Sequence, residues 1–197
     1  MEASVDLLVL VVAAYFIGSV PFAWLIGRYG YGIDLRRVGD RNVGGGNLMA
    51  AAGFLPGFSA IVLDVAKGFA ATLLGLRIAG SDGAMLGGTA AIIGHVWPIW
   101  LRFDGGRGAA AALGVATGLF PWLMAVLLPI AIVLIALTRK TVLVLATVMP
   151  VIPFAAVALG EPVHEAVFIV ALFVGVGLKD AWDRLHAQPA EEQARLR

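Results

Sequence analysis

The chain has 197 residues, of which 60% are hydrophobic and only 14% are charged, and its mean hydropathy is +0.93. So few polar side chains cannot cover a soluble globule of this size, which disfavours a soluble domain and indicates a chain that faces lipid. The absence of cysteine excludes disulfides, thiolate metal sites and cysteine nucleophiles, and with a net charge of +1 we expect no nucleic-acid partner.

Apolar stretches of membrane-spanning character follow one another along the chain. In order, they run from Leu7 to Gly27, Phe54 to Ala79, Ala84 to Leu101, Ala109 to Leu137, Val142 to Leu159 and Val163 to Leu178. The residues before the first stretch are acidic where a signal peptide would be basic, so we expect this stretch to remain as a membrane anchor. The pattern predicts an all-α integral membrane protein.

The stretch from Ala109 to Leu137 is broken at Phe120-Pro121-Trp122, so it could form one bent span or two short ones. The first part, Ala109 to Leu119, would reach only about half of the ~30 Å hydrocarbon core of a bilayer. A single bent span would give six spans in total and would place Arg139 and Lys140 outside the cell. Two spans give about seven and keep both residues in the cytoplasm.

Charge favours seven spans with the N-terminus outside, because basic residues then gather on the cytoplasmic side. These residues are Arg28, Arg36, Arg37, Arg41, Arg102, Arg107, Arg139, Lys140, Lys179, Arg184, Arg195 and Arg197, while the outer loops carry Glu2, Asp6, Asp82, Glu161 and Glu165. We predict one multi-span membrane domain over residues 1–180 and a cytoplasmic C-terminal tail over residues 181–197. Glycines four residues apart, at 83 and 87 and at 114 and 118, predict close packing between helices.

Two loops on the predicted cytoplasmic side combine glycine with basic and amide side chains. Residues 39–47 read Gly-Asp-Arg-Asn-Val-Gly-Gly-Gly-Asn, and residues 103–108 read Phe-Asp-Gly-Gly-Arg-Gly and lead directly into an apolar helix. Glycines let the backbone present successive N–H groups, and a helix N-terminus adds a positive dipole, so both loops suit a phosphate or another anion. Each loop alone could instead be a flexible basic turn beside anionic lipid headgroups.

Three further polar residues lie within the apolar stretches. Asp64 and Lys67 are three residues apart on one helix face at mid-membrane depth, where an unpaired charge costs several kcal/mol, so the sequence predicts a buried ion pair or a water-lined cavity. His95 precedes Trp97 and Pro98, and a lone histidine there could simply form hydrogen bonds at a helix end. No metal-ligand spacing, Walker A loop or nucleophile elbow is present, so we expect no metal and no cofactor.

Several motifs in order resemble the bacterial acyl-phosphate:glycerol-3-phosphate acyltransferase family. They are Tyr15-Phe16-Ile17-Gly18-Ser19-Val20-Pro21-Phe22-Ala23, Ile33-Asp34-Leu35-Arg36-Arg37-Val38-Gly39, Leu63-Asp64-Val65-Ala66-Lys67-Gly68, and Gly94-His95-Val96-Trp97-Pro98 through Gly108. The resemblance implies a multi-pass enzyme of the bacterial inner membrane that works without a metal or a covalent acyl-enzyme. Its substrates would be acyl phosphate and glycerol 3-phosphate, and its product lysophosphatidic acid.

The resemblance also assigns residues to roles. It implies catalytic roles for His95 and for Arg107, which stands where the family usually has lysine. Matching positions expected to bind substrate phosphate are Asn42, Gly44, Asn47, Gly105, Gly106 and Gly108, and Arg41 is added as a basic residue in the same loop.

The chain departs from the family pattern at several polar positions. In and just after the loop of residues 39–47, Asp40 stands where the family has a serine, Arg41 a glycine, Gly46 a threonine and Ala50 an arginine. In the family motif that follows the last apolar stretch, Leu178 and Ala181 stand in place of a histidine and an asparagine, while Arg184 and Leu185 match. Two hypotheses follow. The chain is an acyltransferase of phospholipid biosynthesis, or it is a catalytically impaired relative that binds lipid phosphates, uses another acceptor or regulates a true acyltransferase.

Overall fold

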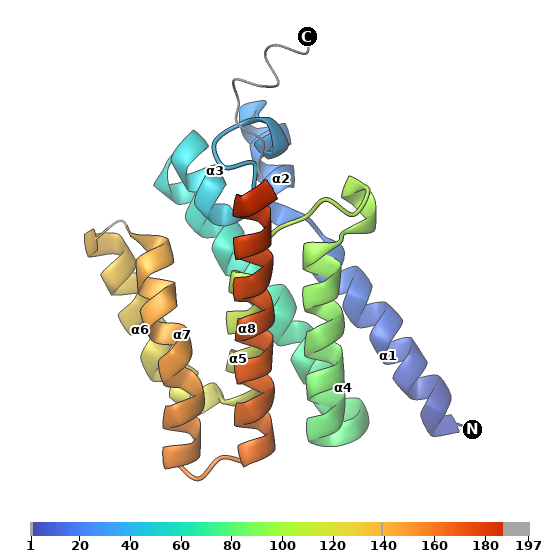
Figure 1. Ribbon diagram of the computed structural model, residues 1–197. Coiled ribbons are helices and arrows are strands. Elements are labelled where there is room, and N and C mark those ends of the chain that lie inside the picture. The colour runs from blue at the N-terminus through green and yellow to red at the C-terminus, as the bar shows by residue number, and fades with distance from the viewer. Residues whose placement is uncertain (1, 139, 187–197) are drawn as a thin grey trace.

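The computed structural model describes residues 2–138 and 140–186, and the regular structure in these residues is entirely helical (Figure 1). The helices are α1 (Glu2–Ser19), α2 (Phe22–Leu25), η1 (Ile26–Gly30), η2 (Leu35–Arg37), α3 (Gly45–Ala52), α4 (Phe54–Val96), η3 (Ile99–Leu101), α5 (Ala109–Leu119), α6 (Pro121–Thr138), α7 (Thr141–Ala158) and α8 (Val163–His186). The prediction of an all-α protein is confirmed. Arg139, Arg195 and Arg197 lie outside the described residues.

Three described stretches are long and apolar enough to cross a membrane: Ala3–Gly30, Phe54–Leu101 and Pro121–Thr138. Ala109–Leu119 and Leu143–Ala158 are also apolar helices but are shorter. The predicted boundary between residues 180 and 181 falls inside α8, which continues to His186, while residues 187–197 of the predicted tail lie outside the described part of the chain.

The first apolar stretch does not form one continuous helix as far as Gly27. α1 ends at Ser19, and the chain then turns at Val20 and Pro21 before α2 begins. Proline has no backbone N–H and restricts the residue before it, which explains the break. The Val20 carbonyl oxygen accepts a hydrogen bond of 3.1 Å from the Phe22 N–H and another of 2.9 Å from Lys67 Nζ.

α4 is two helices joined by a sharp turn. Ala79 and Gly80 have non-helical backbone angles, and Gly80 has a φ of +62°, a conformation that glycine adopts readily. The two halves agree with the two apolar stretches predicted on either side of residue 80. Counted this way, the described residues contain seven long helical segments: α1, the two halves of α4, α5, α6, α7 and α8.

Glycines let the helices of this bundle touch backbone to backbone. A side chain at Gly83 would overlap the carbonyl oxygen of Gly75 in the other half of α4, and one at Gly114 would overlap that of Val65 across the α4–α5 contact. A side chain at Gly87 would overlap the Ala71 carbonyl oxygen, and one at Gly118 would overlap the side chain of Thr72. The close packing predicted from the four-residue glycine spacing is confirmed.

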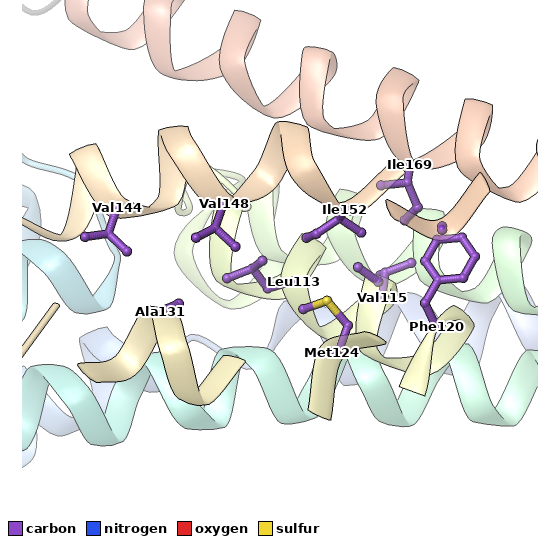
Figure 2. Packing of buried hydrophobic residues seen from close by; sticks show 11 residues of the cluster. Leu113, Val115, Phe120, Met124, Ala131, Val144, Val148, Ile152 and Ile169 are labelled. Carbon is purple, nitrogen blue, oxygen red and sulfur yellow. The ribbon is translucent and has the colours of Figure 1, made fainter. Parts of the chain in front are cut away.

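α5 is the most enclosed long helix of the bundle. Residues 111–116 are all buried, and Phe120, at its end, is 1% exposed. An apolar core extends from α5 to α6, α7 and α8, with Val115, Met124, Ile152 and Ile169 among its buried members (Figure 2). The 11 residues of α5 therefore form a central helix, and α4, α6, α7 and α8 pack against it.

The polar loops gather at one end of the bundle, which is the upper end in Figure 1. That end contains α2, α3, the loop after η3 and the end of α8, and the opposite end contains the N-terminus and the α7–α8 connection (Figure 1). Both glycine-rich loops and the charged last turns of α8 therefore meet over the helices that enclose the apolar core.

Candidate functional site

A cavity of about 740 Å³ joins the polar end of the bundle to its apolar interior. Its polar part is lined by Asn42, Gly44, Gly45, Gly46, Asp64, His95, Arg107, Gly108, Asp180 and Arg184. Its apolar part runs between α4, α6, α7 and α8, along Phe58, Ile61, Val62, Val65, Leu128, Ile132, Met149, Phe154, Val170 and Phe173. The cavity therefore matches a ligand with a polar head and a long apolar chain.

Three buried side-chain atoms among the described residues have no aligned hydrogen-bond partner: Asn42 Oδ1, Asp64 Oδ1 and Arg107 Nε. All three belong to residues that line this cavity. Asp64 Oδ1 and Arg107 Nε still lie at ion-pair distance from Lys67 and Asp180, so their charges are balanced although their hydrogen bonds are not aligned. Buried polar atoms in native proteins nearly always form hydrogen bonds, so Asn42 Oδ1 is the atom of this set that a ligand or water would complete.

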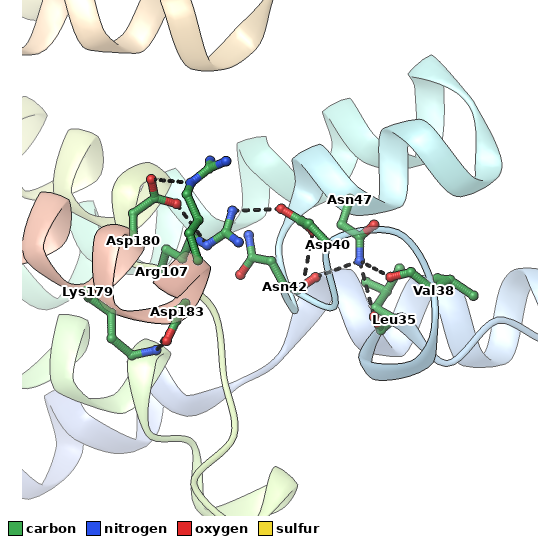
Figure 3. Close-up of polar contacts among 10 residues, drawn as sticks. Leu35, Val38, Asp40, Asn42, Asn47, Arg107, Lys179, Asp180 and Asp183 are labelled. Atoms are coloured by element: carbon green, nitrogen blue, oxygen red, sulfur yellow. Dashed lines mark hydrogen bonds and ion pairs between the residues drawn. The ribbon is translucent and has the colours of Figure 1, made fainter. Parts of the chain in front are cut away.

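The first glycine-rich loop is held in shape by Asn47. Its amide Nδ2 lies 3.1 Å from the carbonyl oxygens of Leu35 and Val38 and 3.0 Å from that of Asn42, and it donates to all three (Figure 3). A side-chain amide has only two N–H groups, so these bonds use its full donor capacity. Asn47 thus connects three parts of the loop, and in the described part of the chain it does not line the cavity. Its contact with phosphate stays a prediction.

The same loop presents backbone donors to the cavity. Gly44 precedes α3, and Gly45 and Gly46 form its first turn, where backbone N–H groups have no partner within the helix. All three glycines line the cavity. Arg41 is half-buried with a φ of +60°, but it does not contribute to the cavity lining in the described part of the chain.

The second glycine-rich loop packs directly on His95. The N–H of Gly106 donates to the His95 carbonyl oxygen at 3.1 Å, and the N–H of Gly105 donates to that of Val96 at 3.2 Å. A side chain at Gly106 would overlap His95 Nε2, and one at Gly105 would overlap the His95 carbonyl oxygen. Gly108, with a φ of +94°, ends the loop and begins α5. The glycines at 105 and 106 are therefore required by close contact with the histidine.

Asp64, Lys67 and His95 form a buried polar cluster on the two halves of α4. Lys67 Nζ lies 2.8 Å from Asp64 Oδ1, and His95 Nδ1 lies 3.6 Å from the same oxygen. The lysine approaches Asp64 at ion-pair distance without the alignment of a hydrogen bond and donates instead to the Val20 carbonyl. Asp64 and His95 line the cavity, whereas Lys67 lies behind them.

Arg107 connects all three polar segments of the site (Figure 3). Its Nη1 donates to Asp40 Oδ2 at 2.7 Å, and its Nε lies 2.9 Å from Asp180 Oδ1 in α8, at ion-pair distance but without hydrogen-bond alignment. Asp180 also accepts a hydrogen bond of 2.8 Å from Arg184 Nε, which raises the pKa of Arg184 above its usual value. We call Asp40, Arg107, Asp180 and Arg184 the charge chain.

Sequence reasoning identified Arg107 and noted Arg184 but missed its two carboxylate partners. The sequence showed Asp40 only as a departure from the family pattern, and it gave no role to Asp180. Asp180 and Arg184 are four residues apart on one helix face, a spacing that does predict an ion pair. No group of three or more histidine, aspartate and glutamate side chains in residues 2–138 and 140–186 is arranged to hold a metal ion.

Residues 8–188 match the family model described as glycerol-3-phosphate acyltransferase. This chain belongs to that family. A glycerol-3-phosphate acyltransferase from Bacillus cytotoxicus is 37% identical over 169 residues, which cover 86% of this chain and 83% of the relative. Glycerol-3-phosphate acyltransferase 2 from Moorella thermoacetica is 43% identical over 114 residues, and that match spans 58% of this chain and 59% of the relative.

The fold of this family member is similar to a solved structure. The crystal structure of PlsY (YgiH), an integral membrane glycerol 3-phosphate acyltransferase in its glycerol 3-phosphate form, superposes with a TM-score of 0.79 at 28% identity. The superposition covers 95% of this chain and 98% of PlsY. The expectation of an integral membrane protein of this family is confirmed.

Proposed function

We propose that this chain transfers a fatty acyl group from acyl phosphate to the 1-hydroxyl of glycerol 3-phosphate and so makes lysophosphatidic acid. The observation that carries the proposal is the single cavity that joins a donor-rich polar head to an apolar groove between α4, α6, α7 and α8. Such a shape holds the phosphate and the acyl chain of the donor together. Family membership and the similarity to PlsY support the same reaction.

In the proposed reaction, the hydroxyl oxygen of the acceptor forms a bond with the acyl carbon, and the bond between that carbon and the phosphate oxygen breaks. Inorganic phosphate leaves, and the hydroxyl proton goes to His95, which lines the cavity beside Asp64. Arg107 and the first N–H groups of α3 hold the phosphates and stabilise negative charge as it develops. Asn42 supplies a further polar group at the head of the cavity.

For the remaining site glycines, we propose positioning roles. Gly105 and Gly106 let the second loop lie against His95, and Gly108 directs the chain from that loop into α5. Asp64 contacts both Lys67 and His95 and is proposed, together with Lys67, to fix the position of His95 at the cavity wall. Arg41, which lies beside the cavity rather than in its lining, is proposed to attract phosphate-bearing substrates to the opening.

We also propose seven membrane spans with the polar loops in the cytoplasm, in the inner membrane of a bacterium. Seven long helical segments alternate in direction (Figure 1), and described basic residues at 28, 36, 37, 41, 102, 107, 140, 179 and 184 belong to the loops or helix ends that connect them on one side of the bundle. Two described basic residues, Lys67 and Arg77, lie instead within the first half of α4. This asymmetry supports a cytoplasmic location for that side of the bundle. The chain has no cysteine, so single cysteines at positions 82 and 102 can report orientation through an impermeant maleimide. Labelling in intact cells at position 102 but not at 82 would contradict the proposal.

The activity is tested with purified protein in lipid, palmitoyl phosphate and labelled glycerol 3-phosphate. Formation of lysophosphatidic acid, dependent on both substrates and absent in Arg107→Ala, supports the proposal. Folded protein that binds lipid phosphate but forms no product would instead favour the impaired, phosphate-binding relative. Arg37→Ala is the matched control, because Arg37 is an exposed arginine of the same end of the bundle and does not line the cavity.

A further inference from the structure

Asp40 makes the two contacts that an oxygen-bearing anion would make at the head of the cavity. Its Oδ2 accepts from Arg107 Nη1 at 2.7 Å, and its Oδ1 accepts from the backbone N–H of Asn42 at 3.2 Å (Figure 3). Both donors belong to residues that line the cavity. A guanidinium edge and a nearby backbone N–H are the donors that proteins commonly offer to phosphate oxygens.

The charge chain is also neutral as a whole. Arg107 and Arg184 contribute two positive charges, and Asp40 and Asp180 contribute two negative charges. A phosphate that approaches Arg107 therefore meets a cation whose charge is already balanced. The phosphate forms a full ion pair with Arg107 only when Asp40 or Asp180 moves away from the guanidinium.

Of the two carboxylates that contact Arg107, Asp40 is the one that can move away from it. Its side chain is 45% exposed, whereas that of Arg107 is 11% exposed. Asp40 lies on a tight loop between Gly39 and Arg41, both of which have positive φ, and Asn47 anchors the loop from its other side. Asp180 is part of the regular helix α8 and is held a second time by Arg184.

We propose that Asp40 is a built-in anion that occupies the phosphate position on Arg107 and sets the affinity of the site for phosphate-bearing lipid. Resting on the proposed function, this makes Asp40 a specificity-determining residue: a phosphate dianion displaces it, and a weaker anion does not. Displacement frees Arg107 Nη1 and the Asn42 N–H together, so both become available to the incoming phosphate. At the position where the family pattern has a serine, this chain therefore has a carboxylate that competes with the substrate phosphate for Arg107.

The test is direct binding of hexadecylphosphonate, which carries a phosphate-like head and cannot transfer an acyl group. The full chain in phosphatidylcholine nanodiscs is compared with Asp40→Asn, Asp40→Ser and Asp40→Glu by equilibrium binding of radiolabelled probe. Asp40→Asn and Asp40→Ser are expected to bind about fivefold to tenfold more tightly, since each loses the competing charge, and Asp40→Glu is expected to stay near the parent value. Thermal unfolding shows that each variant is folded.

Two controls separate displacement from a general change in charge. Asp104→Asn removes an exposed carboxylate from the second loop, outside the charge chain, and is expected to leave binding unchanged. A long-range charge effect is screened by salt, whereas displacement of a contact persists, so the gain of Asp40→Asn should remain at 0.5 M as well as at about 0.05 M salt. An unchanged affinity in folded Asp40→Asn, an equal gain in Asp104→Asn, or a gain that disappears with salt would overturn the proposal.

The outcome is independent of turnover. If the parent protein makes lysophosphatidic acid and Asp40→Asn binds no more tightly, the proposed function stands and the role of Asp40 falls. If the parent protein has no turnover and Asp40→Asn binds the probe more tightly, the role of Asp40 stands and the proposed function falls.

Discussion

The imidazole of His95 lies directly against the backbone of Gly106, and the Gly106 N–H donates to the His95 carbonyl oxygen at 3.1 Å. Both residues belong to the motif from Gly94 to Gly108, with His95 at the end of α4 and Gly106 in the loop before α5. The contact leaves no room for a side chain at position 106. The position of the histidine in the cavity therefore depends on this glycine.

We predict that Gly106→Ala lowers kcat/KM for acyl transfer by at least about 100-fold, because displacement of a reacting group by about 1 Å has an effect of this size. Gly30→Ala is the matched control, since a methyl group at Gly30 meets no atom within 4 Å. Steady-state kinetics on both folded variants check the prediction. Equal activity in Gly106→Ala and the parent protein would show that the position of His95 is unimportant.

For the buried pair on α4, we predict that Lys67→Met destabilises the protein by about 3–5 kcal/mol, since it leaves the Asp64 carboxylate buried without a compensating charge. The double variant Asp64→Asn/Lys67→Met should lose less stability than Lys67→Met, because it leaves no uncompensated charge in the interior. Unfolding free energies measured in detergent or bicelles compare the two. A double variant less stable than the single one would contradict the ion-pair account.

Near the polar end, Asp34 caps η2 and accepts hydrogen bonds from the backbone and side chain of Arg36, which hold the pKa of the Asp34 carboxyl well below its usual range. A group with a lowered pKa stabilises the fold above its unfolded pKa of about 3.9, and this contribution is lost as pH falls through the folded value. Asp34→Asn should therefore reduce stability at pH 7 by about 1 kcal/mol.

The difference in folding stability between the parent protein and Asp34→Asn should become progressively smaller below about pH 4. Thermal unfolding of both proteins at pH 7 and at pH 3 measures it. A difference that widens in acid would mean that Asp34 is not stabilised as a carboxylate.

The charge chain leads to a prediction about Arg107 itself. Arg107→Lys should keep part of the activity, because a lysine retains the charge but cannot use two donors at fixed angles, and we expect a loss of about 10-fold. Arg107→Ala should lose at least about 100-fold. Kinetics with each substrate varied in turn check both values. Activity in Arg107→Lys as low as in Arg107→Ala would show that charge alone is insufficient.

Much of the bundle could be predicted from local pattern. Apolar runs gave the helices and their order, and the glycines at 83, 87, 114 and 118 indicated where backbones touch. The break at Pro21 could also have been expected from the chemistry of proline, yet the apolar run concealed it.

The partners within the site were harder to predict, because they join residues far apart in the chain. Asp40 and Arg107 are separated by 67 positions, and no periodicity connects them. Asn47 fitted a phosphate-binding motif, and only the three-dimensional path of the loop shows that its amide hydrogens bond to neighbouring carbonyls. The types of residue at the site could therefore be predicted from the sequence. Which hydrogen-bond donors remain available for a ligand depends on contacts between distant residues, and these are seen only in the fold.

The central claim is that one cavity holds the phosphate on Arg107 and the acyl chain between α6, α7 and α8. The most direct measurement is photolabelling with a hexadecylphosphonate that carries a diazirine near the end of its chain, followed by mapping of the labelled residues. Label on groove residues such as Ile132, Met149 or Phe154, lost in Arg107→Ala, is the predicted result. Label confined to exposed positions outside the groove, such as Trp122, and unchanged in Arg107→Ala would contradict the account.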